Sequence, residues 1–438
     1  MALSGANLIQ TLSKGMSSFK KHEATQARKE AIARAIMTFA TTKKSPDTRN
    51  MISFWIFGLC NNFTFSMMLS AAQDILSKQN RTSQFNHNVT DVCIPEITHR
   101  ICSPTSAGVV LLCNIVPALM VKLFCPFVMH RVPYGIRHLV ICTLQVTSLL
   151  MTAFSNSVPA ALLGVCVASL AGGLGETTFL GLAGHYSKNT IATWSSGTGM
   201  AGLIGAFSYA GMTDARLLAL SPTRAMLVML VMPAIFAFTL PEKKGPPPDV
   251  DNSSVEFAAQ TGIVDQLRTT KSLLRYMIPM FLVYLAEYLI NQGLLELTVF
   301  DCVHGYGNSP ASQYRWYQVM YQVGVFVSRS SLKFIQFNMT LIALMPLLQL
   351  LNLVFLTFNA IYAFVPHFGM VCAIILYEGL IGGGSYVNTF HHIHKKVDPS
   401  IREFALSTVS LADTLGILVA ALTAIPLHNA ICGMQWYS

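Results

Sequence analysis

Charged side chains are scarce in this chain of 438 residues. Asp, Glu, Lys and Arg make up 11% of it, against about a quarter of a soluble globular protein. Hydrophobic residues make up 53%, and the mean hydropathy is +0.50. So few charges cannot cover the surface of a water-soluble fold of this size. The composition therefore predicts an all-α membrane protein that crosses the bilayer many times.

Several functional motifs are also missing. The sequence has no Walker phosphate loop, no nucleophile elbow around a serine and no CxxC spacing for a metal. His391, His392 and His394 lie beside two lysines at an expected helix end, and we interpret them as a hydrated terminus. The formal charge of +9 comes from connections between apolar segments, not from one basic surface. We predict no enzyme activity, no cofactor, no metal site and no nucleic-acid partner.

Apolar segments are abundant instead. Eleven of them approach the ~20 residues that a helix needs to cross a bilayer. They lie at about 50–76, 106–129, 137–155, 159–184, 193–212, 223–241, 273–299, 313–329, 338–361, 367–391 and 403–428.

Most of the lysines and arginines lie in the tail 1–49 and in every second connection. By the positive-inside rule this predicts a cytosolic N-terminus, and an odd number of spans then places the C-terminus on the opposite, luminal side. The segment 242–272 becomes a cytosolic linker. It separates a six-helix half, 50–241, from a five-helix half, 273–438.

The long connection 77–105 is expected on the luminal side. It carries two glycosylation sequons, at Asn80 and Asn88. Cys93 and Cys102 share this loop, and we predict a disulfide between them. Two further cysteines on the same side, Cys302 and Cys432, are alternative partners.

A weak internal repeat supports the division into halves. Thr178-Phe179 in the fourth span matches Thr389-Phe390 in the tenth. Two repeated halves are typical of transporters whose substrate site lies between them. The repeat predicts that spans one, four, seven and ten surround a central cavity.

Improbable polar residues fall in these four spans. A charge in the middle of a spanning helix opposes insertion by roughly 2.5–3.5 kcal/mol, so such residues usually face a cavity or a partner. The seventh span carries Tyr284, Glu287 and Asn291 on one helical face, with Gln292 beside them. The other three spans supply Asn61 and Asn62, Glu176, and Glu378. A glycine-rich helix contact with capped acids is the alternative. Glu296 lies so near the luminal end that we expect it to meet water.

Basic partners are present as well. Lys122 lies too deep in its span to reach water easily, and it is expected to meet a carboxylate or an anionic substrate. Arg315 lies at the luminal end, where the positive-inside rule does not explain it. Arg329 is explained either as a cytosolic anchor or as a ligand. Asp413 in the last span has either a structural or a coupling role.

Many short motifs resemble the battenin family, the lysosomal membrane proteins whose loss underlies juvenile Batten disease. The likeness spans about residues 50–428. It runs through Gly58-Leu-Cys-Asn-Asn-Phe63, Met68-Leu-Ser-Ala-Ala72, Gly173-Leu-Gly-Glu176, Trp194-Ser-Ser-Gly-Thr-Gly199, Ala286-Glu-Tyr288, Ile290-Asn-Gln-Gly293, Gln313-Tyr-Arg-Trp-Tyr-Gln318, Ser328-Arg-Ser-Ser-Leu332, Tyr377-Glu-Gly-Leu380, Tyr386-Val-Asn-Thr-Phe-His391, Arg402-Glu-Phe-Ala405 and Asp413-Thr-Leu-Gly416.

The resemblance implies an eleven-helix, major-facilitator-like fold, distantly akin to equilibrative nucleoside transporters, in lysosomal and late endosomal membranes. It also implies export of glycerophosphodiesters, the deacylated remnants of phospholipids, although lysosomal pH and basic amino-acid handling are also associated with the family.

These observations combine into one hypothesis: an alternating-access transporter that moves a glycerophosphodiester such as glycerophosphocholine from lysosome to cytosol. Lys122, with Arg315 or Arg329, would balance the phosphate. Glu287 and Glu176 would meet a cationic headgroup or carry a proton. Asn61, Asn62, Asn291 and Gln292 would bind hydroxyls. The alternative function is a non-transporting membrane regulator of lysosomal trafficking or pH, which would work through cytosolic partner proteins.

Overall fold

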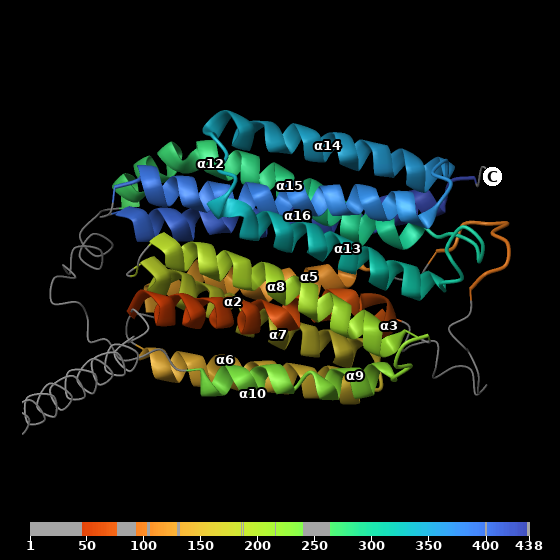
Figure 1. Cartoon of the computed structure of the whole chain (residues 1–438), viewed down its shortest axis with the longest axis horizontal. Coiled ribbons are helices and arrows are strands. Elements are labelled where there is room, and N and C mark those ends of the chain that lie inside the picture. The colour runs from red at the N-terminus through yellow and green to blue at the C-terminus, as the bar shows by residue number, and fades with distance from the viewer. Residues whose placement is uncertain are drawn as a thin grey trace, which may run out of the picture. The chain divides into compact units, whose positions relative to one another are not determined.

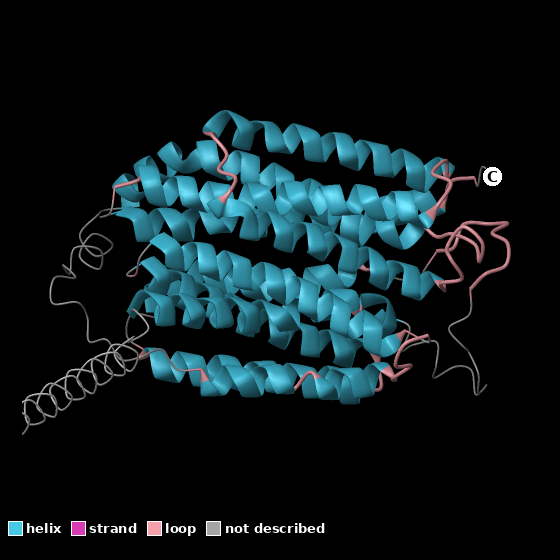
Figure 2. Cartoon of the chain, in the orientation of Figure 1, coloured by secondary structure: helices cyan, strands magenta, loops and turns pink. Residues whose placement is uncertain are grey.

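A computed structural model describes residues 46–76, 93–102, 106–128, 132–184, 186, 188–214, 216–239, 263–398 and 401–435. The chain forms two units, 1–50 and 51–438, and only the start of one helix is described in the first. The predicted sequons Asn80 and Asn88, the tail before residue 46 and most of the linker lie outside the described residues. The described part is built from helices and loops (Figure 2).

The described residues 51–239 are named here the N-terminal half, and residues 263–435 the C-terminal half. The helices of the first are α2 (Pro46–Ser70, which begins before it), α3 (Ala72–Leu76), α5 (Gly108–Val128), α6 (Tyr134–Phe154), α7 (Val158–Gly184), α8 (Lys188–Thr213), α9 (Pro222–Val228) and α10 (Val231–Phe238). The second contains α12 (Ile263–Leu289), α13 (Pro310–Ser330), α14 (Met339–Tyr362), α15 (Phe368–Lys396) and α16 (Arg402–Cys432).

Ten of the eleven predicted spans coincide with one α-helix or with two consecutive α-helices. Seven helices in the described ranges are long and apolar enough to cross a membrane, and the segments Gly108–Phe124 and Pro222–Phe238 are shorter and apolar. The sixth predicted span is divided at Met229 and Leu230 into α9 and α10. α8 and α13 carry more polar residues because they face other helices along much of their length.

The seventh span is not one regular helix. α12 ends at Leu289 and continues as a π-helical turn, Ile290–Leu294, and then a 3-10 turn, Leu295–Leu297. A π turn interrupts the regular backbone hydrogen bonds, and such turns often occur at functional sites. The irregular part begins three residues after Glu287, the acid that the sequence singles out.

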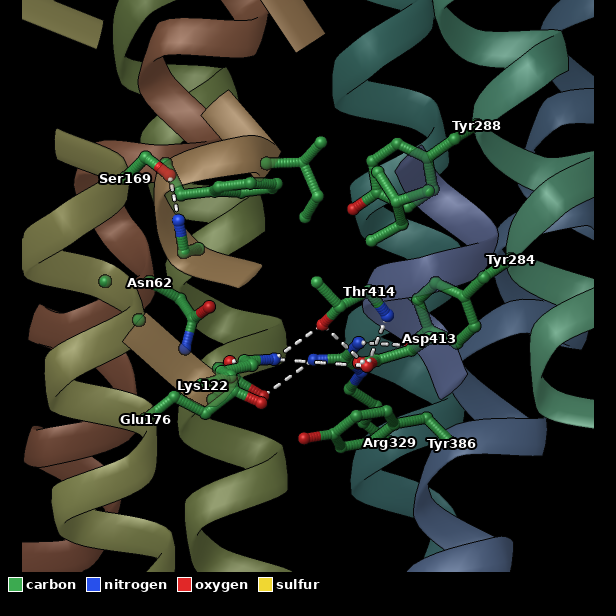
Figure 3. A pocket seen from close by; sticks show the side chains of 17 residues that line it. Asn62, Lys122, Ser169, Glu176, Tyr284, Tyr288, Arg329, Tyr386, Asp413 and Thr414 are labelled. Carbon is green, nitrogen blue, oxygen red and sulfur yellow. Dashed lines mark hydrogen bonds and ion pairs between the residues drawn. The ribbon is translucent and has the colours of Figure 1, made fainter. Parts of the chain in front are cut away.

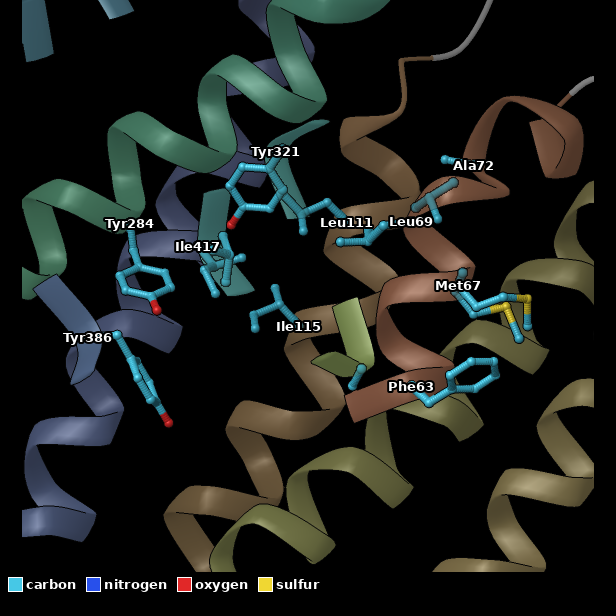
Figure 4. Packing of buried hydrophobic residues seen from close by; sticks show 14 of the residues in the cluster. Phe63, Met67, Leu69, Ala72, Leu111, Ile115, Tyr284, Tyr321, Tyr386 and Ile417 are labelled. Atoms are coloured by element: carbon cyan, nitrogen blue, oxygen red, sulfur yellow. The ribbon is translucent and has the colours of Figure 1, made fainter. Parts of the chain in front are cut away.

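The apolar core is one large cluster with buried residues from both halves, whose helices are shown in Figure 1. Phe63 and Met67 of α2 lie on one side of the apolar cluster, and Tyr284, Tyr321 and Tyr386 lie on the other (Figure 4). Most of these side chains are almost completely buried. Burial of each large apolar side chain contributes about 1.5–3 kcal/mol in a water-soluble protein, whereas in a bilayer close van der Waals packing takes that role.

The disulfides differ from the predicted pairing. Cys93 bonds to Cys302 and Cys102 bonds to Cys432, so the prediction of a Cys93–Cys102 bond is wrong. The short segment 93–102 extends along the C-terminal half instead of folding back on itself. Arg100 holds it there by donating to the carbonyl oxygens of Ile431, Met434 and Ile361.

This end of the bundle, where α3 and α8 end and α13 begins, is named here the disulfide end. Several contacts between the halves also lie there. The Arg315 guanidinium is 3.1 Å from Asp74 Oδ2. Asp214, directly after α8, accepts hydrogen bonds from Ser312 and Trp316 of α13. These contacts hold the two halves together at the disulfide end.

Candidate functional site

A cavity of about 90 Å³ lies between the two halves (Figure 3). Eight helices line it: α2, α5, α7 and α8 from the N-terminal half, and α12, α13, α15 and α16 from the C-terminal half. Predicted site residues that line it are Asn62, Lys122, Glu176, Tyr284, Arg329 and Asp413. The structure thus brings together six polar residues that are far apart in the sequence.

Lys122 is the centre of one group of contacts. Its Nζ lies 2.9 Å from Glu176 Oε2 and 3.9 Å from Asp413 Oδ1, and it donates to Thr414 Oγ1 at 2.8 Å. Lys122 therefore contacts carboxylates, one of the two kinds of partner that its depth in the span predicts. Because Glu176 belongs to α7 and Asp413 to α16, the lysine also connects the two halves.

Arg329 has a different environment. Its guanidinium donates to Thr198 Oγ1 at 2.7 Å and to the Tyr284 hydroxyl at 3.1 Å, and it lies 4.2 Å from the centre of the Tyr386 ring. Within the described residues no carboxylate lies at ion-pair distance from it. Arg329 therefore brings a positive charge, held by neutral groups, to the lining of the cavity.

Tyrosines form one wall of the cavity. The rings of Tyr284 and Tyr288 are stacked with centroids 6.1 Å apart, and the Tyr386 ring lies 6.4 Å from Tyr284. Figure 3 shows these side chains opposite Lys122 and Glu176. The face of an aromatic ring attracts cations. The tyrosine rings and the carboxylates that contact Lys122 therefore provide an environment suited to the cationic group of a ligand.

Four predicted residues form a second buried layer outside the cavity lining. Tyr321 donates to Glu287 Oε1, and the Asn291 amide donates to Glu378 Oε1 at 2.8 Å. Gln292 accepts from the Tyr314 hydroxyl at 2.8 Å. The four predicted residues, Glu287, Asn291, Gln292 and Glu378, are each 2% exposed or less. The acids Glu287 and Glu378 therefore lie behind the cavity wall.

Two further predicted residues have structural partners. Arg315 pairs with Asp74 at the disulfide end, so it lies outside the cavity lining. Asn61 donates to the carbonyl oxygen of Gly172 at 3.2 Å and joins α2 to α7. A Cβ at Gly175 would overlap the Asn61 side chain, so glycine is needed there for close approach.

The expectation that Glu296 meets water is wrong. Its carboxylate accepts from the Ser106 hydroxyl at 2.7 Å and from the Ala107 amide at 2.9 Å, and its Oε1 lies 3.6 Å from His428 Nε2. The sequence placed Glu296 near a helix end. Ser106 and Ala107, which come directly before α5, cover the Glu296 carboxylate there, and distance from the end of a span does not reveal such a contact.

Sequence reasoning missed several lining residues. Thr198, Tyr288, Tyr386 and Thr414 all face the cavity. Tyr288 lies four residues after Tyr284, and Thr414 follows Asp413, so helical spacing could have indicated both. Thr198 and Tyr386 occur in motifs of the family resemblance but carry no charge that would mark them as improbable.

Solved transporters share this arrangement of helices. A D-xylose-proton symporter matches with a TM-score of 0.55 at 10% identity, over 87% of this chain and 90% of that one. The human organic anion transporter MFSD10 matches with a TM-score of 0.53 at 13% identity, over 88% and 96%. These identities are low, so the likeness concerns the fold alone. The protein has a major-facilitator-like transporter fold.

Sequence comparison identifies the family. The family model described as "CLN3 protein" matches residues 52–244 and 241–434. Battenin of Canis lupus familiaris is 42% identical over 413 residues, which cover 88% of this chain and 92% of that one. Protein btn-1 of Neurospora crassa is 34% identical and covers 90% of each. The chain belongs to the battenin family, which confirms the resemblance seen in its motifs.

Proposed function

We propose that this protein exports glycerophosphodiesters such as glycerophosphocholine from the lysosome to the cytosol by alternating access. One observation carries the proposal. Arg329 presents a guanidinium to the cavity, and the groups that it contacts are hydroxyls and an aromatic ring. A guanidinium held in this way can exchange neutral partners for an anion without leaving a carboxylate unpaired.

The chemistry of a phosphodiester fits this arrangement. Its two non-ester oxygens share one negative charge and match the planar fork of an arginine, which makes two parallel hydrogen bonds. A quaternary ammonium group fits against the faces of Tyr284 and Tyr288, opposite the carboxylate of Glu176. Asn62 offers hydrogen bonds for the glycerol hydroxyls.

The size of the cavity requires a conformational change. About 90 Å³ is well below the roughly 300–1,000 Å³ of typical small-molecule pockets. The described conformation is therefore too closed for the whole substrate. The contacts of Arg315 with Asp74 and of Ser312 with Asp214 must break for the disulfide end to open. Alternate opening at the two ends would expose the cavity to each compartment in turn.

The disulfide end is assigned to the lysosomal lumen in this proposal. Disulfides form and persist in oxidising compartments and are rare facing the cytosol. Four cysteines are paired at this end of the bundle. The same assignment places the basic tail 1–49 in the cytosol, where it could contact trafficking proteins.

Transport in liposomes tests the proposal. Purified protein is reconstituted, and uptake of radiolabelled glycerophosphocholine is compared with empty liposomes. Arg329→Gln is expected to lower kcat/KM at least about tenfold, because a hydrogen bond to a charged group contributes roughly 1.5–3 kcal/mol. Arg275→Gln is the matched control, because Arg275 of α12 is exposed and lies outside the cavity lining. It should keep wild-type uptake.

Two results would overturn the proposal: wild-type uptake no greater than in empty liposomes, or normal uptake by Arg329→Gln. The first result would favour the regulator function. That function predicts that deletion of residues 1–45 abolishes activity in cells, whereas substitutions in the cavity do not.

A further inference from the structure

We propose that the buried pair Glu287 and Glu378 is a proton-binding site separate from the substrate cavity. In this proposal a proton on Glu287 frees Arg329 to bind the phosphate. The inference rests on the proposed function, since it names the group that couples transport to the acidity of the lumen. The contacts of the second buried layer carry it.

The two carboxylates have few partners. Glu287 is 1% exposed and Glu378 is fully buried. Glu287 Oε1 accepts from Tyr321, Glu378 Oε1 accepts from Asn291, and the Oε2 atom of each acid has no hydrogen-bond partner. Among the described residues no lysine, arginine or histidine lies within ion-pair distance of either acid. Both acids therefore lack the cation that would compensate a buried negative charge.

Ionisation of a buried carboxylate without a cationic partner is energetically unfavourable. Transfer of an ionised carboxylate from water into an apolar interior is unfavourable by several kcal/mol unless it is paired and fully hydrogen-bonded. A second carboxylate nearby adds like-charge repulsion. The two groups interact electrostatically across the contact between α12 and α15. The pair is therefore expected to hold at least one proton.

The backbone around Glu287 leaves space for its carboxylate. A Cβ at Gly382 of α15 would overlap the Glu287 carboxylate, so glycine at that position leaves the space that the acid occupies. The π-helical turn Ile290–Leu294 begins three residues after Glu287 and interrupts the regular α-helix there. A turn of this kind gives α12 a point where a small rearrangement can follow a change of charge.

Other ionisable groups face Glu287 from each packed helix. They are Tyr284 and Tyr288 of α12 itself, Tyr321 and Arg329 of α13, Glu378 of α15 and Asp413 of α16. Arg329 is the positively charged member of this group. The Tyr284 hydroxyl accepts from Arg329, and Tyr284 lies one turn before Glu287. Tyr284 thus contacts Arg329 at the cavity and shares a helical face with Glu287.

This arrangement couples the proton to the anion. When Glu287 is ionised, its charge attracts Arg329 and competes with a phosphate. When Glu287 is protonated, the full positive charge of Arg329 is available to the phosphate. Coupling between two ligands is reciprocal, so the phosphodiester also favours the proton. Both would bind from the acidic lumen and leave together into the cytosol.

Binding measurements test the coupling. The affinity of the protein in lipid nanodiscs for labelled glycerophosphocholine is measured in mildly acidic and in neutral buffer. The wild type should bind about 5–150-fold more tightly in acid, the usual range for coupled sites. Glu287→Gln should bind tightly at both pH values, because its side chain is neutral and has nearly the same shape. Glu287→Asp should keep the pH dependence.

Glu296→Gln is the matched control. It makes the same change in the same stretch of chain, but Glu296 contacts Ser106 and Ala107 rather than the cavity wall. Its affinity should vary with pH as in the wild type. A wild-type pH dependence in Glu287→Gln would overturn the proton site.

An infrared titration separates this proposal from the proposed function. The carbonyl stretch of a protonated carboxyl needs no substrate for detection. We expect the wild type to show a pH-dependent carbonyl band from a buried, protonated carboxyl group. This band should be lost or weakened in both Glu287→Gln and Glu378→Gln. Its presence in a wild type that binds no glycerophosphocholine would leave the proton site standing and reject the substrate. Its absence would reject the proton site even if transport occurs.

Discussion

At the scale of single residues, the two positive charges of the site have different kinds of partner. Lys122 is shared by Glu176 and Asp413, whereas Arg329 contacts hydroxyls and a ring. The sequence predicted a cluster of polar groups, and for Lys122 it predicted either a carboxylate or an anionic substrate as partner. It could not distinguish the cavity residues from the second layer, because Tyr284 and Glu287 are only one helical turn apart.

The Lys122 group allows a prediction about stability. Lys122→Met should destabilise the protein by about 3–5 kcal/mol, because removal of one member of a buried ion pair leaves the other charge uncompensated. Thermal unfolding in detergent, followed by tryptophan fluorescence, measures the loss. The double variant Lys122→Met/Glu176→Gln should recover part of it. Equal stability of Lys122→Met and wild type would contradict this account of the group.

At the scale of helices, close packing positions the functional groups. α13 carries both Arg329 and Tyr321, and it packs closely against α15. Gly324 of α13 and Gly379 of α15 face each other at this contact. Small residues allow helices in membranes to approach closely. The contact therefore fixes the position of Arg329 relative to the tyrosine wall.

Enlargement of one glycine tests this contact. A Cβ at Gly379 would meet the carbonyl oxygen of Tyr321 and the amide of Val325. Gly379→Ala should therefore destabilise the protein by about 1–3 kcal/mol, as overpacking commonly does, and should also weaken binding of glycerophosphocholine. Gly135→Ala is the control, because a Cβ at Gly135 has no heavy atom within 4 Å. Equal unfolding temperatures for the two variants would argue against a tight contact.

At the scale of the whole membrane unit, residues 51–438, polar contacts at the disulfide end join the two halves. Burial alone would raise the pKa of Asp214, but hydrogen bonds from the Arg216 amide, Trp316 and Ser312 outweigh it, and the net pKa lies below its ordinary value. A group with a lowered pKa stabilises the folded state above its unfolded pKa. This contribution is lost only as the pH falls through the lower, folded value.

The acidity of a lysosome should therefore leave the Asp214 contact intact. Asp214→Asn is expected to lower the unfolding temperature in neutral and in mildly acidic buffer alike. The two unfolding curves should converge only in strong acid, below the ordinary pKa of an aspartate. Unfolding temperature as a function of pH measures this. Convergence already in mildly acidic buffer would show that the contact itself responds to luminal pH.

The sequence by itself determined the class of the protein, the approximate limits of its spans and its family. Length and apolar composition suffice for the spans, because each helix must satisfy its own backbone and cross a hydrocarbon layer of fixed thickness. The motifs suffice for the family because they extend along most of the chain. The repeat, the orientation and the sequons remain predictions.

Only the tertiary structure decided which polar residues share the cavity and which cysteines are bonded. Arg315 and Arg329 lie on the same helix, yet one meets Asp74 at the disulfide end and the other faces the cavity. Cys93 and Cys102 are close in sequence, yet each is bonded to a cysteine of the C-terminal half. Rotation of each helix about its axis and the course of the loops decide such contacts. Both depend on packing between segments that are far apart in the sequence.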